Sequence, residues 1–232
     1  MTTNRLTTVY ATDEHVAIRA AGDYNLLVPE DQVIASGSDG VISSGSLWNL
    51  TSATINFANQ GLANGNVIKL SHQTNRSVYG PAGDRFAVES VSGSTVTLRR
   101  LGQPANVGQP AAPTAGLASI IFQACTFYPQ IEEASWEINR RYGIDEASLI
   151  GKTPANLADQ RDLRALTVLM VLHGLYIAKA RGGSAQGGEW WAKVKTVKEE
   201  LDRVEGRISV RWGSQDAPTH NSTTLFSGRI GR

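Results

Sequence analysis

The amino-acid sequence predicts an α+β protein with a C-terminal helical bundle, an inserted small antiparallel β-barrel or β-sandwich domain, and an extended C-terminal tail. Residues 36–113 are rich in glycine and serine and have the pattern of short strands and turns, whereas residues 114–206 show helical periodicity. Residues 207–232 are mostly polar or small, with isolated apolar positions. Residues 1–35 form a helical segment that we expect to pack on the bundle.

The overall composition is that of an ordinary globular protein. The 232 residues carry a net charge of +1 and 41% are hydrophobic, so nothing indicates a general attraction to nucleic acid or to an anionic membrane. One cysteine, Cys125, excludes an internal disulfide framework and fits a reducing compartment. The N-terminus has no signal-peptide pattern, and the apolar stretch 165–178 is shorter than the roughly 20 residues that cross a bilayer. We therefore expect no membrane association.

The N-terminal segment has a helix-start pattern. Thr12 is a candidate N-cap, two acidic residues follow it, and Gly22 is a stop, which predicts a short helix over 13–21. Pro29 has the fixed φ that suits a first helical turn, so a second short helix is expected there.

The pattern is β from residue 36 to about residue 103. The segment 61–66 is a dense turn signal before the strand-like NVIKLS, and Ser92-Gly93 separates two alternating segments that we interpret as a hairpin. About five short strands in this region predict a small barrel or a sandwich. A connector of Pro, Ala and Gly covers 103–116, and the segment GLASIIFQA after it is a candidate further strand.

Three helices are expected after the connector. The first has Pro129 in its first turn and Gly143 just past its end. Its apolar face consists of Phe127, Ile131, Ala134, Ile138 and Tyr142. The second begins at Thr153-Pro154, runs to about Arg181 and is apolar all round its middle, so it is the expected central element. The third follows the loop 182–188 and carries an a/d stripe of Trp190, Val194, Val197, Leu201 and Val204.

Motifs for catalysis, metal binding or nucleotide binding are missing from the pattern. The four histidines lie far apart, and with one cysteine there is no spacing typical of a zinc site. Cys125 and His173 are a conceivable nucleophile and base, but the apolar context FQACTF favours a small buried thiol. GKT at 151–153 resembles the end of a phosphate-binding loop, but that motif needs glycine where this chain has Glu146. We expect no catalytic residue, no cofactor and no metal.

Three tryptophans are candidate contact residues. Trp190 belongs to the apolar stripe of the last helix, so Trp191 faces outward, and we predict that this pair marks an interface with another subunit. Trp212, in the tail, has no local core in the sequence pattern, which favours a docked aromatic anchor.

The order of these elements resembles that of the head-to-tail adaptor, or connector, proteins of tailed bacteriophages. The resemblance rests on the short N-terminal helix, on TFYPQIEEASWEINRRYGID, on the long helix with DLRALTVLMVLHGLYIAKA, and on the charged amphipathic helix with its arginine-ended tail. It covers about 10–25 and 120–232, and it consists of pattern and order without diagnostic residues. The β-rich 36–113 departs from a minimal adaptor and stands where such proteins sometimes carry an inserted domain.

The resemblance implies a non-enzymatic structural protein of the virion. In that family the bundle forms a ring beneath the portal, usually of twelve copies, and the C-terminal tail grips the portal. The implied partners are the portal protein, neighbouring copies of the chain in a dodecamer, a downstream neck or tail protein, and packaged DNA that passes through the channel without sequence-specific binding. The implied location is the head–tail connector, after assembly in the host cytoplasm. The portal-docking residues of the tail 207–232 would be Arg211, Trp212, Leu225, Phe226, Arg229 and Arg232.

Two other classes of function stay open at this point. The β-rich domain could be a binding module that holds a protein or a glycan, for which Trp48 and Tyr79 are candidate contacts. An enzyme whose site is built from residues distant in sequence leaves no motif to find. For the tail, the alternative is a frayed terminus.

Overall fold

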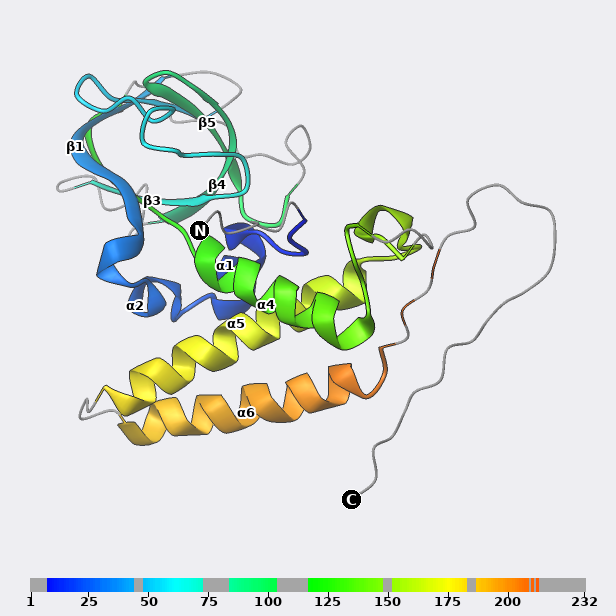
Figure 1. Ribbon diagram of the computed structural model, residues 1–232. Coiled ribbons are helices and arrows are strands. Elements are labelled where there is room, and N and C mark those ends of the chain that lie inside the picture. The colour runs from blue at the N-terminus through cyan, green and yellow to red at the C-terminus, as the bar shows by residue number, and fades with distance from the viewer. Residues whose placement is uncertain are drawn as a thin grey trace.

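A closed β-barrel stands beside a layer of helices in the computed structural model (Figure 1). The structure describes residues 8–43, 48–72, 84–103, 117–147, 152–182, 187–208, 210 and 212.

The barrel has six strands in the order β1-β2-β5-β4-β3-β6, and every neighbouring pair is antiparallel. The strands are β1 Val33–Ser43, β2 Trp48–Thr51, β3 Val67–His72, β4 Asp84–Ser92, β5 Thr95–Arg100 and β6 Leu117–Cys125. The predicted hairpin at Ser92-Gly93 is confirmed, because Ser92 of β4 pairs with Thr95 of β5. The last strand, β6, pairs with both β1 and β3 and so closes the barrel.

The predicted fold class is wrong in how it divides the chain. We expected a barrel or sandwich of about five strands, inserted at 36–113 into a helical bundle. The structure instead has a closed six-stranded barrel whose first strand starts at Val33 and whose last ends at Cys125. The strand 117–125 is part of the barrel because its alternate residues Ile120, Phe122 and Ala124 point into the interior, and because its pairing leaves no open sheet edge.

The barrel interior is packed with apolar side chains. Trp48 and Phe86 lie with ring centroids 5.0 Å apart, and Phe57 meets Phe122 edge to face at 5.3 Å. Gly37 of β1 is needed for this packing, since a Cβ there would lie 2.6 Å from Cζ of Phe122. The interior of the barrel is therefore an apolar core of packed side chains.

The helices are α1 Asp13–Ala20, α2 Tyr24–Leu27, α4 Tyr128–Tyr142, α5 Arg161–Arg181 and α6 Gly187–Glu205, with 3-10 turns at Glu30–Gln32 and Pro154–Asn156. Helix α5 lies between α4 and α6 and also contacts α1 and α2 (Figure 1). Gly143 ends α4 in the left-handed conformation, as its position predicted. The second long helix starts at Arg161 and not at Thr153 as expected, because Leu157 is extended and pairs with Trp212.

Helix α5 is the central helix, as the sequence predicted. By length and composition alone it is apolar enough to cross a membrane, but 56% of its most apolar stretch is buried inside the protein. Its residues contribute to two apolar clusters, one with α1, α2, α4 and α6 and one at the Leu163 end of the helix. Burial in the core accounts for the apolar character of this helix.

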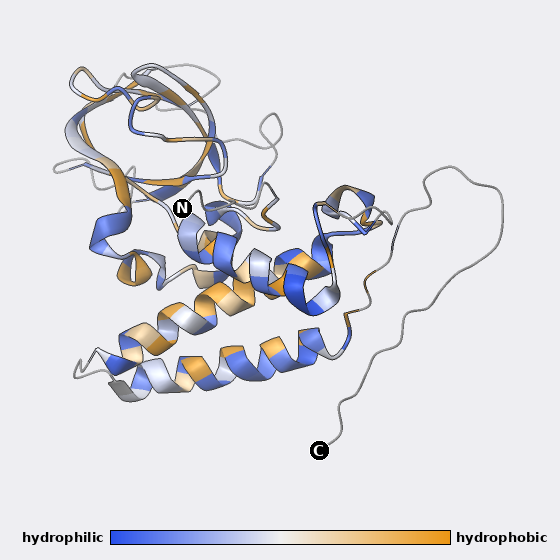
Figure 2. Ribbon diagram, viewed as in Figure 1, coloured by the Kyte–Doolittle hydropathy of each residue, from blue (hydrophilic) through white to orange (hydrophobic). Residues whose placement is uncertain are grey.

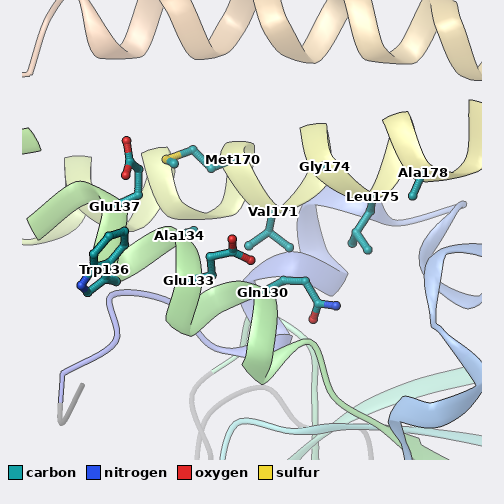
Figure 3. A pocket seen from close by; sticks show the side chains of 10 residues that line it. All are labelled: Gln130, Glu133, Ala134, Trp136, Glu137, Met170, Val171, Gly174, Leu175 and Ala178. Atoms are coloured by element: carbon teal, nitrogen blue, oxygen red, sulfur yellow. The ribbon is translucent and has the colours of Figure 1, made fainter. Parts of the chain in front are cut away.

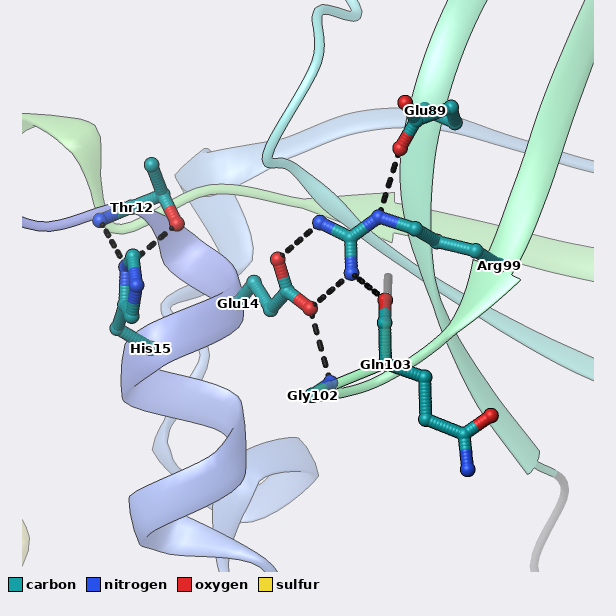
Figure 4. A network of polar contacts seen from close by, with 7 residues as sticks. All are labelled: Thr12, Glu14, His15, Glu89, Arg99, Gly102 and Gln103. Carbon is teal, nitrogen blue, oxygen red and sulfur yellow. Dashed lines mark hydrogen bonds and ion pairs between the residues drawn. The ribbon is translucent and has the colours of Figure 1, made fainter. Parts of the chain in front are cut away.

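Buried charged groups join the helices to the barrel (Figure 4). Asp13 accepts hydrogen bonds from the backbone N–H of Phe127 at 2.6 Å and from Nδ2 of Asn66 at 2.7 Å. Burial raises the pKa of Asp13, although these hydrogen bonds act in the opposite direction. Arg99 of β5 forms a bidentate ion pair with Glu14, with both N–O distances 2.5 Å, and Arg99 also binds Glu89 at 2.7 Å. The first turn of α1 is thereby fixed to the barrel.

His15 closes the N-terminus of α1 in its neutral form. Its Nδ1 accepts the backbone N–H of Thr12 at 3.0 Å, which requires this nitrogen to be unprotonated (Figure 4). Burial lowers the pKa of His15, and the charges of Arg164 and Arg99 lower it further, whereas Glu14 raises it.

The stability of the protein should therefore fall on mild acidification. Because the folded-state pKa of His15 lies below its unfolded value of about 6.5, its contribution is fully present above pH ~6.5. That contribution is lost as the pH falls through the folded pKa. We expect a loss of up to about 1 kcal/mol from the open cap.

Urea unfolding of wild type and His15→Gln at neutral and mildly acidic pH measures this effect. Glutamine at this position keeps the capping box but does not titrate. Asp13 is present in both proteins, so its own titration changes the stability of both. Equal loss of stability in the two proteins would assign the pH dependence to another group.

Candidate interaction surface

An apolar groove of about 460 Å³ runs between α4 and α5 (Figure 3). It is lined by Gln130, Glu133, Ala134, Trp136, Glu137, Met170, Val171, Gly174, Leu175 and Ala178. The groove exists because α4 turns only one stripe of residues toward α5. Ile131, Ala134 and Ile138 of that stripe are buried, whereas Trp136 is 52% exposed at the rim.

The groove continues toward the start of α6. Leu175 and Ala178 also line a second hollow of about 540 Å³, together with Leu26 of α2, Pro29 just after α2, and Trp190 of α6. Leu26 is 56% exposed. Colouring by hydropathy shows many apolar residues along α5 (Figure 2), and α5 residues line both hollows. Together they form one apolar surface, which we call the α5 groove.

Most charges at the rim of the α5 groove are already paired. Glu137 binds Arg140 at 2.9 Å and Arg141 at 2.7 Å, and the hydrogen bonds from these two guanidinium groups lower the pKa of Glu137 to about 2. Arg140 also lies 5.5 Å above the ring of Trp136. Glu133 differs from them: its exposed carboxylate has no ion pair or hydrogen bond within the part of the chain that the structure describes.

The predicted tryptophan pair of α6 is divided by the fold. Trp190 is 5% exposed and stacks on Tyr176 of the same chain at 5.8 Å, with Nζ of Lys193 4.6 Å from the ring. Trp191 is 50% exposed. The role of Trp191 at a subunit interface stays a prediction. Trp190 is reachable by another subunit only where it lines the second hollow of the α5 groove.

Trp212 does have a local core, contrary to the sequence interpretation. It is half-buried, forms an antiparallel bridge with Leu157, and packs against the buried apolar cluster that includes Ile138 and Leu163. The other predicted portal-docking residues, Arg211, Leu225, Phe226, Arg229 and Arg232, lie outside the described residues. Their role stays a prediction.

Replacement of Trp212 by alanine should therefore destabilise the isolated chain. A large aromatic residue in a core contributes about 3 to 5 kcal/mol, and for this half-buried one we expect a loss of about 1 to 2 kcal/mol. Chemical denaturation measures it, with Trp191→Ala as the matched control for an exposed tryptophan, within about 0.5 kcal/mol of wild type. Equal stability of the two variants would show that Trp212 is free of the bundle in solution.

Within the described residues, no hydrogen bond or ion pair joins Cys125 to His173. Cys125 is buried on β6, and burial raises its pKa to about 11, which makes the thiol a poor nucleophile. His173 lies half-buried on α5, where burial lowers its pKa. Trp48 is 4% exposed inside the barrel, and Tyr79 lies outside the described residues. Within the described ranges, no group of three His, Cys, Asp or Glu residues could hold a metal ion.

Sequence reasoning missed the α5 groove. Trp136 carried a signal, because a tryptophan beside the apolar stripe of an amphipathic helix is left exposed unless something covers it. Gly174 in the middle of a long helix was a second signal. Comparison with protein-family models, with curated proteins and with solved structures found no match.

Proposed function

We propose that the chain is a structural, non-enzymatic subunit of a phage head-to-tail adaptor, which assembles with copies of itself into a ring beneath a portal. The observation that carries the proposal is the uncovered α5 groove, with Trp136 and Leu26 more than half exposed along it. A contiguous apolar surface on a globular protein marks a site of association.

The arrangement of the helices also favours assembly. Ion pairs fix α6 against the rest of the chain: Lys193 binds Asp23 at 2.9 Å, Arg141 binds Glu205 at 2.5 Å, and Arg19 binds Glu200. A layer of helices with an apolar groove on α5 and an exposed tryptophan on α6 offers two different surfaces. Contact between two different surfaces of neighbouring copies is the geometry that generates rings.

The barrel gives less support to a binding module. Its interior is filled, and Trp48 packs on Phe86 within it. The charged groups where α1 meets the barrel are paired with one another, as Glu14, Arg99 and Glu89 show.

Electron microscopy of portal-bearing, DNA-filled capsids that lack tails, mixed with the purified protein, tests the proposed function. We expect a symmetric ring of added density below the portal. No added density at saturating protein would overturn the proposal and move the search to a ligand of the barrel.

A truncated variant tests the role of the tail in the same assay. Removal of 207–232 would also remove Ile208, Val210 and Trp212, which pack on the bundle. Removal of 213–232 avoids this loss. We expect that shorter truncation to keep the stability of the full chain and to lose attachment to the capsid, whereas retained attachment would show that the tail is not the portal-gripping segment.

A further inference from the structure

We propose that Trp191 on α6 of one copy inserts into the α5 groove of the next copy, between α4 and α5. The inference deepens the proposed function and rests on it in one respect, namely that copies of the chain assemble side by side. The molecule that fills the groove is a second copy of this chain, which contributes the exposed face of its α6.

Gly174 is the first reason to place a partner in the groove. Glycine in a helix interior is unfavourable relative to alanine. A Cβ at Gly174 would have no atom within 4 Å, so packing within the subunit does not explain why a side chain is missing. Close approach by another molecule does explain it. Ala178, one turn further along α5, is also exposed and extends the shallow floor of the groove.

Trp191 is the second reason, because it is a large apolar side chain that its own subunit leaves uncovered. It is 50% exposed and lines neither hollow of its own α5 groove. Tryptophan is enriched at the centres of protein interfaces, where it fills a pocket on the partner. Trp136 and Met170 supply apolar walls for such a pocket.

Charge complementarity is the third reason. Lys195 follows Trp191 by one helical turn and is exposed, and no ion pair or hydrogen bond engages its side chain among the described residues. Glu133 on the groove rim is the unpaired charge of opposite sign. An α6 laid along the groove with Trp191 in it would offer Lys195 to Glu133. The two would then pair across the interface.

The interface is heterologous, since the groove and Trp191 belong to different surfaces. Each copy keeps one unused surface after pairing, so further copies add, and a ring forms when the rotation between neighbouring copies closes. A symmetric dimer, by contrast, would use one surface twice.

Covalent trapping in solution tests the inference without a capsid. In a Cys125→Ala background, one preparation carries Ala178→Cys in the groove and another, tagged to differ in mass, carries Ala192→Cys beside Trp191. The two are mixed at up to about 1 mM, which populates even weak contacts, and treated with a short bifunctional thiol reagent. We expect mixed dimers in at least severalfold excess over both like dimers.

Variants make the outcome decisive. Gly174→Leu in the groove copy, or Trp191→Ala in the other, should remove the mixed product, and Gly174→Leu should keep or raise the melting temperature. Ala165→Leu, an exposed position of α5 outside the groove, is the control that should change nothing.

Three results would overturn the interface: no excess of mixed dimers, an excess that survives Gly174→Leu, or a dominant like dimer of the Ala178→Cys copies. If ring density appears on capsids but no mixed dimer is trapped, the proposed interface is wrong and the proposed function stands. If mixed dimers are trapped but no ring density appears, the interface stands and the proposed function is wrong.

Discussion

Replacement of Arg99 by alanine is expected to lower the free energy of unfolding by about 3 to 5 kcal/mol, because it leaves Glu14 buried without its counter-charge. The side chains of this pair are 15% and 9% exposed, so the Glu14 carboxylate is largely shielded from water and relies on the guanidinium group as its charge partner. Arg99 also binds Glu89 and the backbone carbonyl of Gln103, which lose their donor in the variant. Equilibrium denaturation in urea measures the change.

Two controls separate the buried ion pair from the loss of any arginine. Arg161→Ala removes an exposed partner of Asp159, for which we expect a change of less than about 1 kcal/mol. The double variant Arg99→Met with Glu14→Gln should cost less than the sum of the two single replacements, since no charge is left buried. A loss below about 1 kcal/mol for Arg99→Ala would show that the junction between α1 and the barrel is open to water.

Phe122→Ala is the second large effect, with an expected loss of about 3 to 5 kcal/mol. Phe122 is 1% exposed and packs edge to face on Phe57 in the barrel interior. Its removal leaves a cavity between β1 and β6, which the rigid barrel cannot close. Thermal or urea unfolding measures the loss.

Gly37 of β1, which pairs with Phe122 of β6, allows a second test of the packing around the Phe122 ring. Gly37→Ala alone should cost about 1 to 3 kcal/mol, because its Cβ would lie 2.6 Å from Cζ of Phe122. In the Phe122→Ala background the same methyl group meets no ring, so we expect the two losses to be clearly less than additive. Gly22→Ala, where a Cβ meets nothing within 4 Å, is the control. Additive losses would mean that β1 moves away from Phe122.

The residues that stabilise the fold and those of the proposed interface lie in separate parts of the molecule. Arg99 and Phe122 lie in or beside the barrel, whereas Gly174 and Trp191 lie on the helical layer. Variants of the first pair should reduce the amount of folded protein. Variants of the second pair should leave folded protein that does not associate.

Elements that depend on neighbouring residues could be predicted from the sequence alone. The apolar stripe of α4 and its glycine stop, the central position of α5, and the hairpin of β4 and β5 followed from periodicity and turn residues. These signals act over a few residues, so they can be read along the chain.

Closure of the barrel and the contacts of the polar residues of α1 depend on the three-dimensional fold and could not be predicted from the sequence. β6 pairs with β1 far away in sequence, and Glu14 meets Arg99 across a separation of 85 residues. In the sequence alone, Glu14 looks like an ordinary acidic residue in the first turn of a helix. The packing of Trp212 could not be predicted from the sequence for the same reason, because its partner Leu157 is far from it along the chain. The α5 groove likewise arises where two helices meet, and no local pattern encodes the space between two surfaces.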